Sequence, residues 1–286
     1  MYKIGNVIII LKGLKKANES ICLKLFQTQQ KGKYNVEYNV HYAKKFETLK
    51  NYLCIYSNNQ FAVIINNNRK LFCYILDQKV YAILEELEEG KKYELYLNSS
   101  FFKGNIHEYL IPSLLEIERS LIKQNSLVLH SSYLSKKNEA ILFTAPSGGG
   151  KSTQAELWKK YKNAEIVNGD KSIIGKENGK WYAYGIPFSG SSEYCLNRTC
   201  ALKAIVILDK GPMNTLVPVG IRGFSNVFSQ VTVNPWDKEF CNKAMDLVMD
   251  VCNEVPIYYY SCTKTPEAVE VLYQEFIEKG ILNGSV

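Results

Sequence analysis

The sequence predicts an α/β fold in which a β-rich N-terminal unit, residues 1–95, precedes a larger α/β domain, residues 96–286. In the second part, strand-like and helix-like segments alternate around a glycine-rich turn, which is typical of a sheet covered by helices. The first part has strand-like runs separated by turn residues and no motif of known chemistry. With 46% hydrophobic residues, a chain of 286 residues can form a substantial core.

The N-terminal unit is expected to be mostly sheet. Its first apolar run, residues 7–11, is too short to cross a bilayer and is expected to be a strand. Residues 61–65 and 71–76 are expected to form a hairpin, because Asn66-Asn67-Asn68 between them tolerates the left-handed turn conformation. Further strands are expected at residues 36–42 and 53–56, and a short helix at residues 80–88.

An amphipathic helix is expected at residues 108–123. Its apolar residues share one face at helical spacing, namely Leu110, Leu114, Ile117, Leu121 and Ile122. Glu116, Glu118 and Arg119 are therefore expected on the exterior. Strands should follow at residues 127–133, 141–144, 164–167, 181–184, 204–208 and 256–261. Helices are expected at residues 153–161, from Pro235 after an Asn234 N-cap to about residue 253, and from Thr265-Pro266 to Gly280.

The turn between residues 141–144 and 153–161 has the composition of a phosphate-binding loop. Residues 145–153 read Ala-Pro-Ser-Gly-Gly-Gly-Lys-Ser-Thr, and glycines let successive backbone N–H groups converge on an anion. Lys151 would place positive charge on the β- and γ-phosphates, and the Ser152 hydroxyl would ligate Mg²⁺. The predicted nucleotide-binding residues are Ser147, Gly148, Gly149, Gly150, Lys151, Ser152 and Thr153. The usual pattern has glycine in place of Ala145, and a tight connection without a ligand stays open as the alternative.

Two aspartates are candidates for the metal and for the proton of an attacking alcohol. Asp170 follows the strand at residues 164–167, where it is expected beside the phosphates as Mg²⁺ ligand, general base or both. Asp209 ends the apolar strand at residues 204–208 in the manner of a Walker B strand. Either aspartate also fits an ordinary turn, after Gly169 in one case and before Lys210-Gly211-Pro212 in the other.

Two further features lie near these candidates. His130, beside the expected phosphate-loop strand, is predicted to hydrogen-bond the γ-phosphate or to tune Asp170, with a core histidine as the alternative. The loop at residues 189–192 is expected either to position an acceptor or a phosphate or to act as a spacer.

Composition excludes several classes of function. The net charge of +7 is spread over small lysine clusters, and the tyrosines fall in strand-like runs, so no nucleic-acid partner is expected. Eight cysteines without a Cys-x-x-Cys pair, together with three histidines, argue against a zinc site. Cysteines without such a pattern, in a sequence with no recognisable signal peptide or membrane segment, indicate a reduced cytoplasmic protein.

Four segments in this order resemble the HPr kinase/phosphorylase-like P-loop kinases, which share their fold with ATP-dependent phosphoenolpyruvate carboxykinase. They are Leu129-His130-Ser131-Ser132, the loop at residues 145–153, Asn168-Gly169-Asp170 and Ile186-Pro187-Phe188-Ser189-Gly190. The resemblance covers about residues 108–275. It implies that Lys151, Ser152 and Thr153 bind ATP and Mg²⁺. It also implies that Asp170 is the catalytic carboxylate, that His130 is its partner, and that Glu193 is an additional acid.

The resemblance also has limits that shape the expected activity. Gly169 and Lys171 flank Asp170 where kinase/phosphorylase members carry paired aspartates, and the arginine-rich glycine loop that grips HPr is not evident. Relatives of this size resemble serine kinases that act on peptides, including lasso-peptide precursors, and a few act on free serine. The expected function is therefore ATP- and Mg²⁺-dependent phosphorylation of a serine hydroxyl, most simply in a ribosomally made peptide.

Two other functions stay open, a small-molecule kinase and a nucleotide-sensing protein that transfers nothing. The N-terminal unit could dock a peptide as an added strand. A homo-oligomer also stays open, because relatives often assemble.

Overall fold

The structure is a computed structural model that describes residues 1–30, 32, 34–46, 52–103, 110–188, 190 and 192–283. Contacts divide the chain into two units. Unit 1 comprises Met1–Gln124 and Pro235–Lys238, and unit 2 comprises Asn125–Asn234 and Glu239–Val286. Both contain strands and helices, so the mixed α/β character predicted from the sequence is confirmed.

The division between the units differs from the boundary expected after residue 95. The segment that precedes Gln124 packs into unit 1, where the Tyr38 hydroxyl donates a hydrogen bond to the Leu115 carbonyl at 2.8 Å. Unit 2 therefore begins at Asn125.

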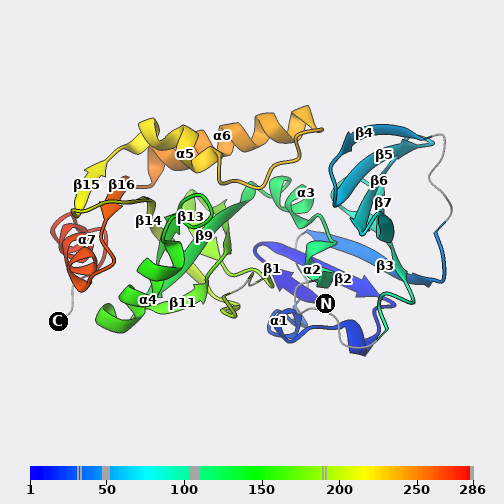
Figure 1. Ribbon diagram of the computed structural model, residues 1–286, viewed down its shortest axis with the longest axis horizontal. Helices are drawn as coiled ribbons and strands as arrows, with labels where there is room; N and C mark the ends of the chain where they lie inside the picture. Colours follow the sequence, from blue (N-terminus) through cyan, green and yellow to red (C-terminus); the bar gives the residue numbers. More distant parts are fainter. Residues whose placement is uncertain are drawn as a thin grey trace. The chain divides into compact units, whose positions relative to one another are not determined.

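Unit 1 is built on a mixed sheet, in which Figure 1 shows β4 to β7 side by side. Its strands are β1 (Tyr2–Ile4), β2 (Val7–Lys12), β3 (Asn35–Ala43), β4 (Leu53–Ser57), β5 (Phe61–Asn66), β6 (Arg69–Leu76), β7 (Lys79–Glu88) and β8 (Lys92–Asn98). The order in space is β1-β2-β3-β8-β7-β6-β5-β4, and β3 is parallel to both of its neighbours. The helical segments are η1 (Lys16–Asn18), α1 (Ile21–Lys24), α2 (Leu110–Ser113) and α3 (Ile117–Ile122).

Two tight turns set the register of β5, β6 and β7. The predicted hairpin is confirmed, because Asn67 and Asn68 join β5 to β6 with φ angles of 47° and 62°. Asp77 and Gln78 make a similar turn before β7, with φ angles of 47° and 61°. The helix expected at residues 80–88 is wrong. This segment belongs to β7, and pairing with β6 and β8 on its two edges overrides the helix preference of its Ala, Leu and Glu residues.

The helix expected over residues 108–123 is interrupted. The structure has α2 and α3 in its place, and residues 108 and 109 lie outside the described part of the chain. Glu116 adopts the left-handed conformation with φ of 43°, through which a right-handed helix cannot continue. The expected apolar face is nevertheless buried at Leu114, Ile117 and Leu121.

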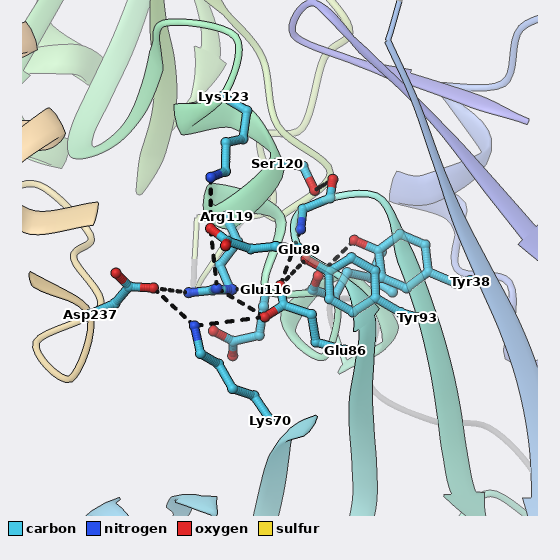
Figure 2. A network of polar contacts seen from close by, with 12 residues as sticks. Tyr38, Lys70, Glu86, Glu89, Tyr93, Glu116, Arg119, Ser120, Lys123 and Asp237 are labelled. Carbon is cyan, nitrogen blue, oxygen red and sulfur yellow. Dashed lines mark hydrogen bonds and ion pairs between the residues drawn. The ribbon is translucent and has the colours of Figure 1, made fainter. Parts of the chain in front are cut away.

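Arg119, expected on the exterior, is only 2% exposed. Its guanidinium donates to both carboxylate oxygens of Glu86, at 2.9 and 3.0 Å, and to Asp237 at 3.0 Å (Figure 2). The ammonium group of Lys70 lies 3.3 Å from the same Asp237 oxygen. This network holds the segment Pro235–Lys238 in unit 1, although that segment is remote in sequence from the rest of the unit.

We expect Glu116 to make the stability of unit 1 depend on pH. Burial and the nearby Glu118 carboxylate raise the pKa of Glu116 well above its ordinary value, and Glu116 Oε1 accepts a hydrogen bond from the Tyr74 hydroxyl at 2.9 Å. A carboxyl group whose pKa is raised by folding binds its proton more tightly in the folded chain than in the unfolded chain. Its stabilising contribution is complete below the ordinary glutamate pKa and is lost as the pH rises toward the folded-state value.

We expect Glu116→Gln to increase stability relative to the wild type at about pH 8, with the difference shrinking toward about pH 4, because glutamine stays neutral throughout. Urea unfolding at a series of pH values measures the effect. Glu37→Gln, which removes the surface partner of Lys12 at 2.8 Å, should give no gain at high pH. Identical pH profiles for the wild type and Glu116→Gln would contradict the assignment.

Unit 2 is a strongly curved sheet with helices against it. Its strands are β9 (Ser126–Lys136), β10 (Glu139–Thr144), β11 (Glu165–Asn168), β12 (Lys171–Glu177), β13 (Lys180–Tyr184), β14 (Thr199–Lys210), β15 (Thr215–Pro218) and β16 (Ile257–Cys262). Its helical segments are α4 (Lys151–Lys162), η2 (Gly220–Gly223), α5 (Phe224–Phe228), α6 (Lys238–Glu254) and α7 (Pro266–Glu278). As predicted, β9 and β10 are neighbours, while β12 and β15 were not predicted. Because β10 also pairs with β14, the path β10-β9-β12-β13-β14 closes on itself.

The three helices predicted for unit 2 are present, two of them with shifted starts. α4 begins at Lys151 rather than at residue 153, while η2 and α5 were not predicted. α7 begins at Pro266 after Thr265, as expected. α6 begins at Lys238 rather than at Pro235, because Trp236 packs in unit 1 against Tyr56 and Phe61, with ring centroids 4.8 and 5.4 Å apart. No helix in the described part of the chain combines the length and the apolar character needed to cross a bilayer.

Candidate active site

The glycine-rich turn connects the end of β10 to the start of α4, as the sequence predicts. Gly148 and Gly150 have φ angles of 76° and 98°, in a region of backbone conformation that residues with a Cβ rarely adopt. A Cβ added at either position would meet no atom within 4 Å, so both face open space. The turn therefore presents bare backbone to the surroundings, next to the N-terminus of a twelve-residue helix.

Ala145 stands where the usual pattern has glycine, and the missing side chain of Gly149 makes room for it. A Cβ at residue 149 would lie 2.5 Å from the Ala145 Cβ and 3.0 Å from the Pro146 carbonyl oxygen. The Gly149 N–H donates to the same Pro146 oxygen at 3.0 Å. The loop thus closes tightly at its entry, and a methyl group fits at residue 145 only because residue 149 has none.

We expect Gly149→Ala to distort the loop and weaken Mg-nucleotide binding, because the added Cβ clashes with Ala145 and Pro146, an overpacking that costs about 1–3 kcal/mol of folding free energy. Ala145→Gly in the same chain should recover part of the loss, since it removes the closest clash. The contact with Pro146 remains, so recovery is expected to be incomplete. Calorimetric titration measures affinity, and circular dichroism checks that each variant is folded. Affinity no better in the double variant than in Gly149→Ala would show that the 145–149 contact does not shape the loop.

Lys151 is folded back onto the loop in this structure. Its ammonium group donates to the carbonyls of Ala145 and Pro146 at 2.8 and 3.3 Å. Burial lowers the pKa of Lys151, and the charge of Asp170 opposes that shift. A phosphate placed in the loop would offer stronger acceptors than these two carbonyls.

Asp170 is held by its neighbour Asn168, for which no role was predicted from the sequence. The fully buried Asn168 side chain accepts from the N–H groups of Asp170 and Lys171, at 2.9 and 3.0 Å. Its amide donates to the carbonyls of Ile186 and Phe188, at 3.2 and 2.6 Å. Asn-Gly-Asp is a typical turn of this kind, so the sequence contained a signal for this role.

His130 faces Asp170 from β9. Its Nε2 lies 3.5 Å from Asp170 Oδ1, and its Nδ1 lies 3.2 Å from Gln230 Oε1. The pKa of Asp170 is lowered, and the largest cause is the hydrogen bond from His130. The positive charges of His130, Lys171 and Lys151 lower it further. Asp170 is therefore an ionised carboxylate at neutral pH, able to take a proton or to bind a cation.

The glycines around Asp170 let neighbouring backbone approach it closely. A Cβ at Gly169 would lie 2.4 Å from the Ser192 side chain, and a Cβ at Gly190 would lie 2.8 Å from the Asp170 carboxyl carbon. Gly190 also has a φ angle of 55°. Gly190 thus packs directly onto Asp170, and the Ser192 side chain leaves no room for a side chain at residue 169.

These groups surround one cavity of about 290 Å³. Its lining among the described residues is His130, Ser147, Gly148, Gly149, Gly150, Lys151, Ser152, Thr153, Gly169, Asp170, Ser192, Lys210 and Lys264. The structure therefore brings together His130, Asp170 and the whole predicted nucleotide set. Ser189 and Ser191 of the expected acceptor loop lie outside the described residues. Lys210 and Lys264 were missed as site residues, because only the pairing of parallel strands brings them here.

The remaining candidates, Asp209 and Glu193, are sequence neighbours of lining residues but do not line the cavity themselves. Asp209 accepts hydrogen bonds from the Tyr259 hydroxyl at 2.7 Å and from the Lys210 N–H at 2.9 Å. Glu193 follows Ser192 in the left-handed conformation, with φ of 60°. Neither side chain is part of the lining.

The donors present suit Mg²⁺. In the part of the chain that the structure describes, no three His, Cys, Asp or Glu side chains gather as they would for an all-protein metal site. Mg²⁺ in phosphoryl-transfer sites typically uses one or two protein oxygens and completes its shell with phosphate and water. The Ser152 hydroxyl and the Asp170 carboxylate, both on the cavity wall, are oxygen donors of that kind.

Comparison with known proteins adds little to this picture. The chain matches no protein-family model and, at a significant level, no curated protein sequence. Among solved structures it is similar to the HPr(Ser) kinase/phosphatase from Coxiella burnetii, with 12% sequence identity and a TM-score of 0.32. That alignment covers 54% of this chain and 97% of the other. Similarity at this level does not assign a function.

Proposed function

We propose that this chain is a kinase of the HPr kinase-like type that transfers the terminal phosphoryl group of ATP to a serine hydroxyl, in a peptide. The observation that carries the proposal is the presence of an ionised Asp170 in the same cavity as a glycine loop, Lys151 and Ser152. Phosphoryl transfer needs a phosphate cradle, positive charge and a group that receives the proton of the alcohol. The lining supplies residues of each kind.

In the proposed reaction, the alcohol oxygen forms a bond to the γ-phosphorus while the bond from that phosphorus to the β–γ bridging oxygen breaks. Asp170 accepts the proton of the alcohol. Lys151 turns from the carbonyls of Ala145 and Pro146 to the phosphate oxygens, and His130 keeps the Asp170 carboxylate oriented. When bound at Ser152 and Asp170, Mg²⁺ would neutralise part of the phosphate charge.

A second cavity offers room for the acceptor. It measures about 210 Å³ and shares Ser152, Gly169 and Ser192 with the first. The rest of its lining among the described residues is Ala155, Glu156, Ile166 and Tyr194. A volume of this order suits a side chain or a small molecule, so a serine of a flexible peptide fits the proposal better than a serine on a rigid protein surface.

The test is incubation of the full chain with γ-labelled ATP, Mg²⁺ and either serine-containing peptides or free serine. Label in a peptide that is lost in Lys151→Met supports the proposal. Label in free serine alone would make the chain a small-molecule kinase. Retention of ATP without transfer to any acceptor, including metabolite pools, would make it a nucleotide sensor and overturn the proposed activity.

A further inference from the structure

The phosphate loop lies between two different sets of strand ends. At the end of β10, Thr144 is paired with Ser131 of β9 on one side and with Ile207 of β14 on the other. Because β10 and β14 are parallel, both strands finish at the same edge of the sheet. A ligand lying along the loop therefore has the β9 side at one end and the β14 side at the other.

The β9 side carries the acid and the histidine. His130 belongs to β9, and its partner in register on β12 is Lys171, which directly follows Asp170. The β14 side carries two lysines. Lys210 is the last residue of β14 and is paired with Cys262 of the parallel strand β16, and Lys264 comes two residues later. Both lysines line the cavity.

The backbone that presents these lysines is firmly held. Gln154 of α4 donates its amide to the Thr263 carbonyl at 2.8 Å, and the Thr263 N–H donates to Asn214 Oδ1 at 2.8 Å. After Lys210, the Gly211 N–H donates to the Cys262 carbonyl at 3.2 Å. A Cβ at Gly211 would lie 2.0 Å from the Ser261 hydroxyl oxygen, so glycine allows the two strand ends to meet. The lysines therefore start from fixed positions.

We infer that Lys210 and Lys264 bind the nucleoside-proximal phosphate of the nucleotide and thereby fix its direction across the loop. The inference rests on the proposed function, which places the terminal phosphate beside Asp170. A phosphate chain that starts there and follows the loop ends on the β14 side, where these lysines lie. Among the described lining residues, the carboxylate is that of Asp170, on the β9 side. The β14 side, which carries Lys210 and Lys264, therefore favours an anion.

The same geometry argues against a role for these lysines in binding the acceptor. The attacking alcohol must reach Asp170 and approach in line with the bond that breaks. An acceptor bound by Lys210 and Lys264 would lie at the opposite end of the loop from the Asp170 carboxylate. Binding of the donor nucleotide is therefore the role that agrees with Asp170 as the base.

The test is calorimetric titration of the full chain with Mg-ATP and with Mg-ADP, in the wild type and in the double variant Lys210→Met, Lys264→Met. We expect affinity for both nucleotides to fall at least tenfold and by similar factors, because ATP and ADP share the nucleoside-proximal phosphate. The variant Lys210→Arg, Lys264→Arg should lose much less, since charge is kept. Lys180→Met, an exposed lysine of β13 outside the cavity lining, is the matched control and should bind as the wild type does.

Each other outcome has a definite meaning. A loss for ATP with ADP unchanged would place the lysines at the terminal phosphate and overturn the inferred direction. Unchanged affinity for both nucleotides would overturn the inference while leaving the proposed kinase intact. Another outcome is that the wild type binds nucleotide but phosphorylates nothing, while the double variant loses affinity for ATP and ADP by similar factors. That result would support the inference and contradict the proposed activity. A wild type that binds neither nucleotide would overturn both.

Discussion

Replacement of Asp170 by asparagine is expected to slow phosphoryl transfer by about 10²–10⁴-fold, the usual contribution of a general base. Asparagine keeps the size of the side chain but cannot accept the proton of the alcohol. The turn itself should survive, because Asn168 holds it through the backbone N–H groups of Asp170 and Lys171. Single-turnover transfer from labelled ATP measures the rate, and titration with ADP checks that the phosphate loop still binds nucleotide.

Asp209→Asn is the matched control for this experiment. Asp209 also follows an apolar strand segment, but its carboxylate contacts Tyr259 and is not part of the cavity lining. Its replacement should change the transfer rate by less than about twofold, as expected for a surface change away from the chemistry. A large loss in Asp209→Asn together with a normal rate in Asp170→Asn would reverse the assignment of the two acids.

Features set by neighbours in sequence could be predicted from the chain alone. The phosphate loop is specified within the run from Ala145 to Thr153, where the glycines, the lysine and the flanking strand and helix occur together. The hairpin at Asn67 and Asn68 is likewise a local matter, because both residues tolerate positive φ. His130 and Asp170 could be named as candidates, but their separation of 3.5 Å depends on the pairing of β9 with β12.

Features set by distant partners were missed or mistaken. β7 carries helix-favouring residues, and its pairing with β6 and β8 decides its conformation. Lys210 reaches the site because β14 is parallel to β10 and β16, a register that no short pattern encodes. Arg119 fits the outer face of an isolated helix, and its carboxylate partners lie far away in sequence.

Arg119→Met is expected to destabilise unit 1 by about 3–5 kcal/mol, the usual cost of removing one partner from a buried ion pair. The change leaves Glu86, itself only 7% exposed, without its bidentate partner. Hydrogen exchange followed by mass spectrometry measures the effect, since backbone amides of unit 1 should exchange faster while those of unit 2 serve as an internal reference. Arg69→Met is the control, because Arg69 pairs with Glu85 at 2.7 Å with more than half of its side chain exposed. Its loss should cost about 0–1 kcal/mol.

A second pair of variants separates the charge of Arg119 from its packing. If the loss comes from buried carboxylates without a countercharge, adding Glu86→Gln and Asp237→Asn to Arg119→Met should recover most of it. If the loss comes from the missing volume of the guanidinium, the triple variant should be no more stable than the single one. Lys70 bears on the size of the recovery, because it already lies 3.3 Å from Asp237 and 4.0 Å from Glu86. Neutralising both acids leaves Lys70 as the unpaired charge, but 29% of its side chain is exposed, so water can solvate it and recovery should still dominate.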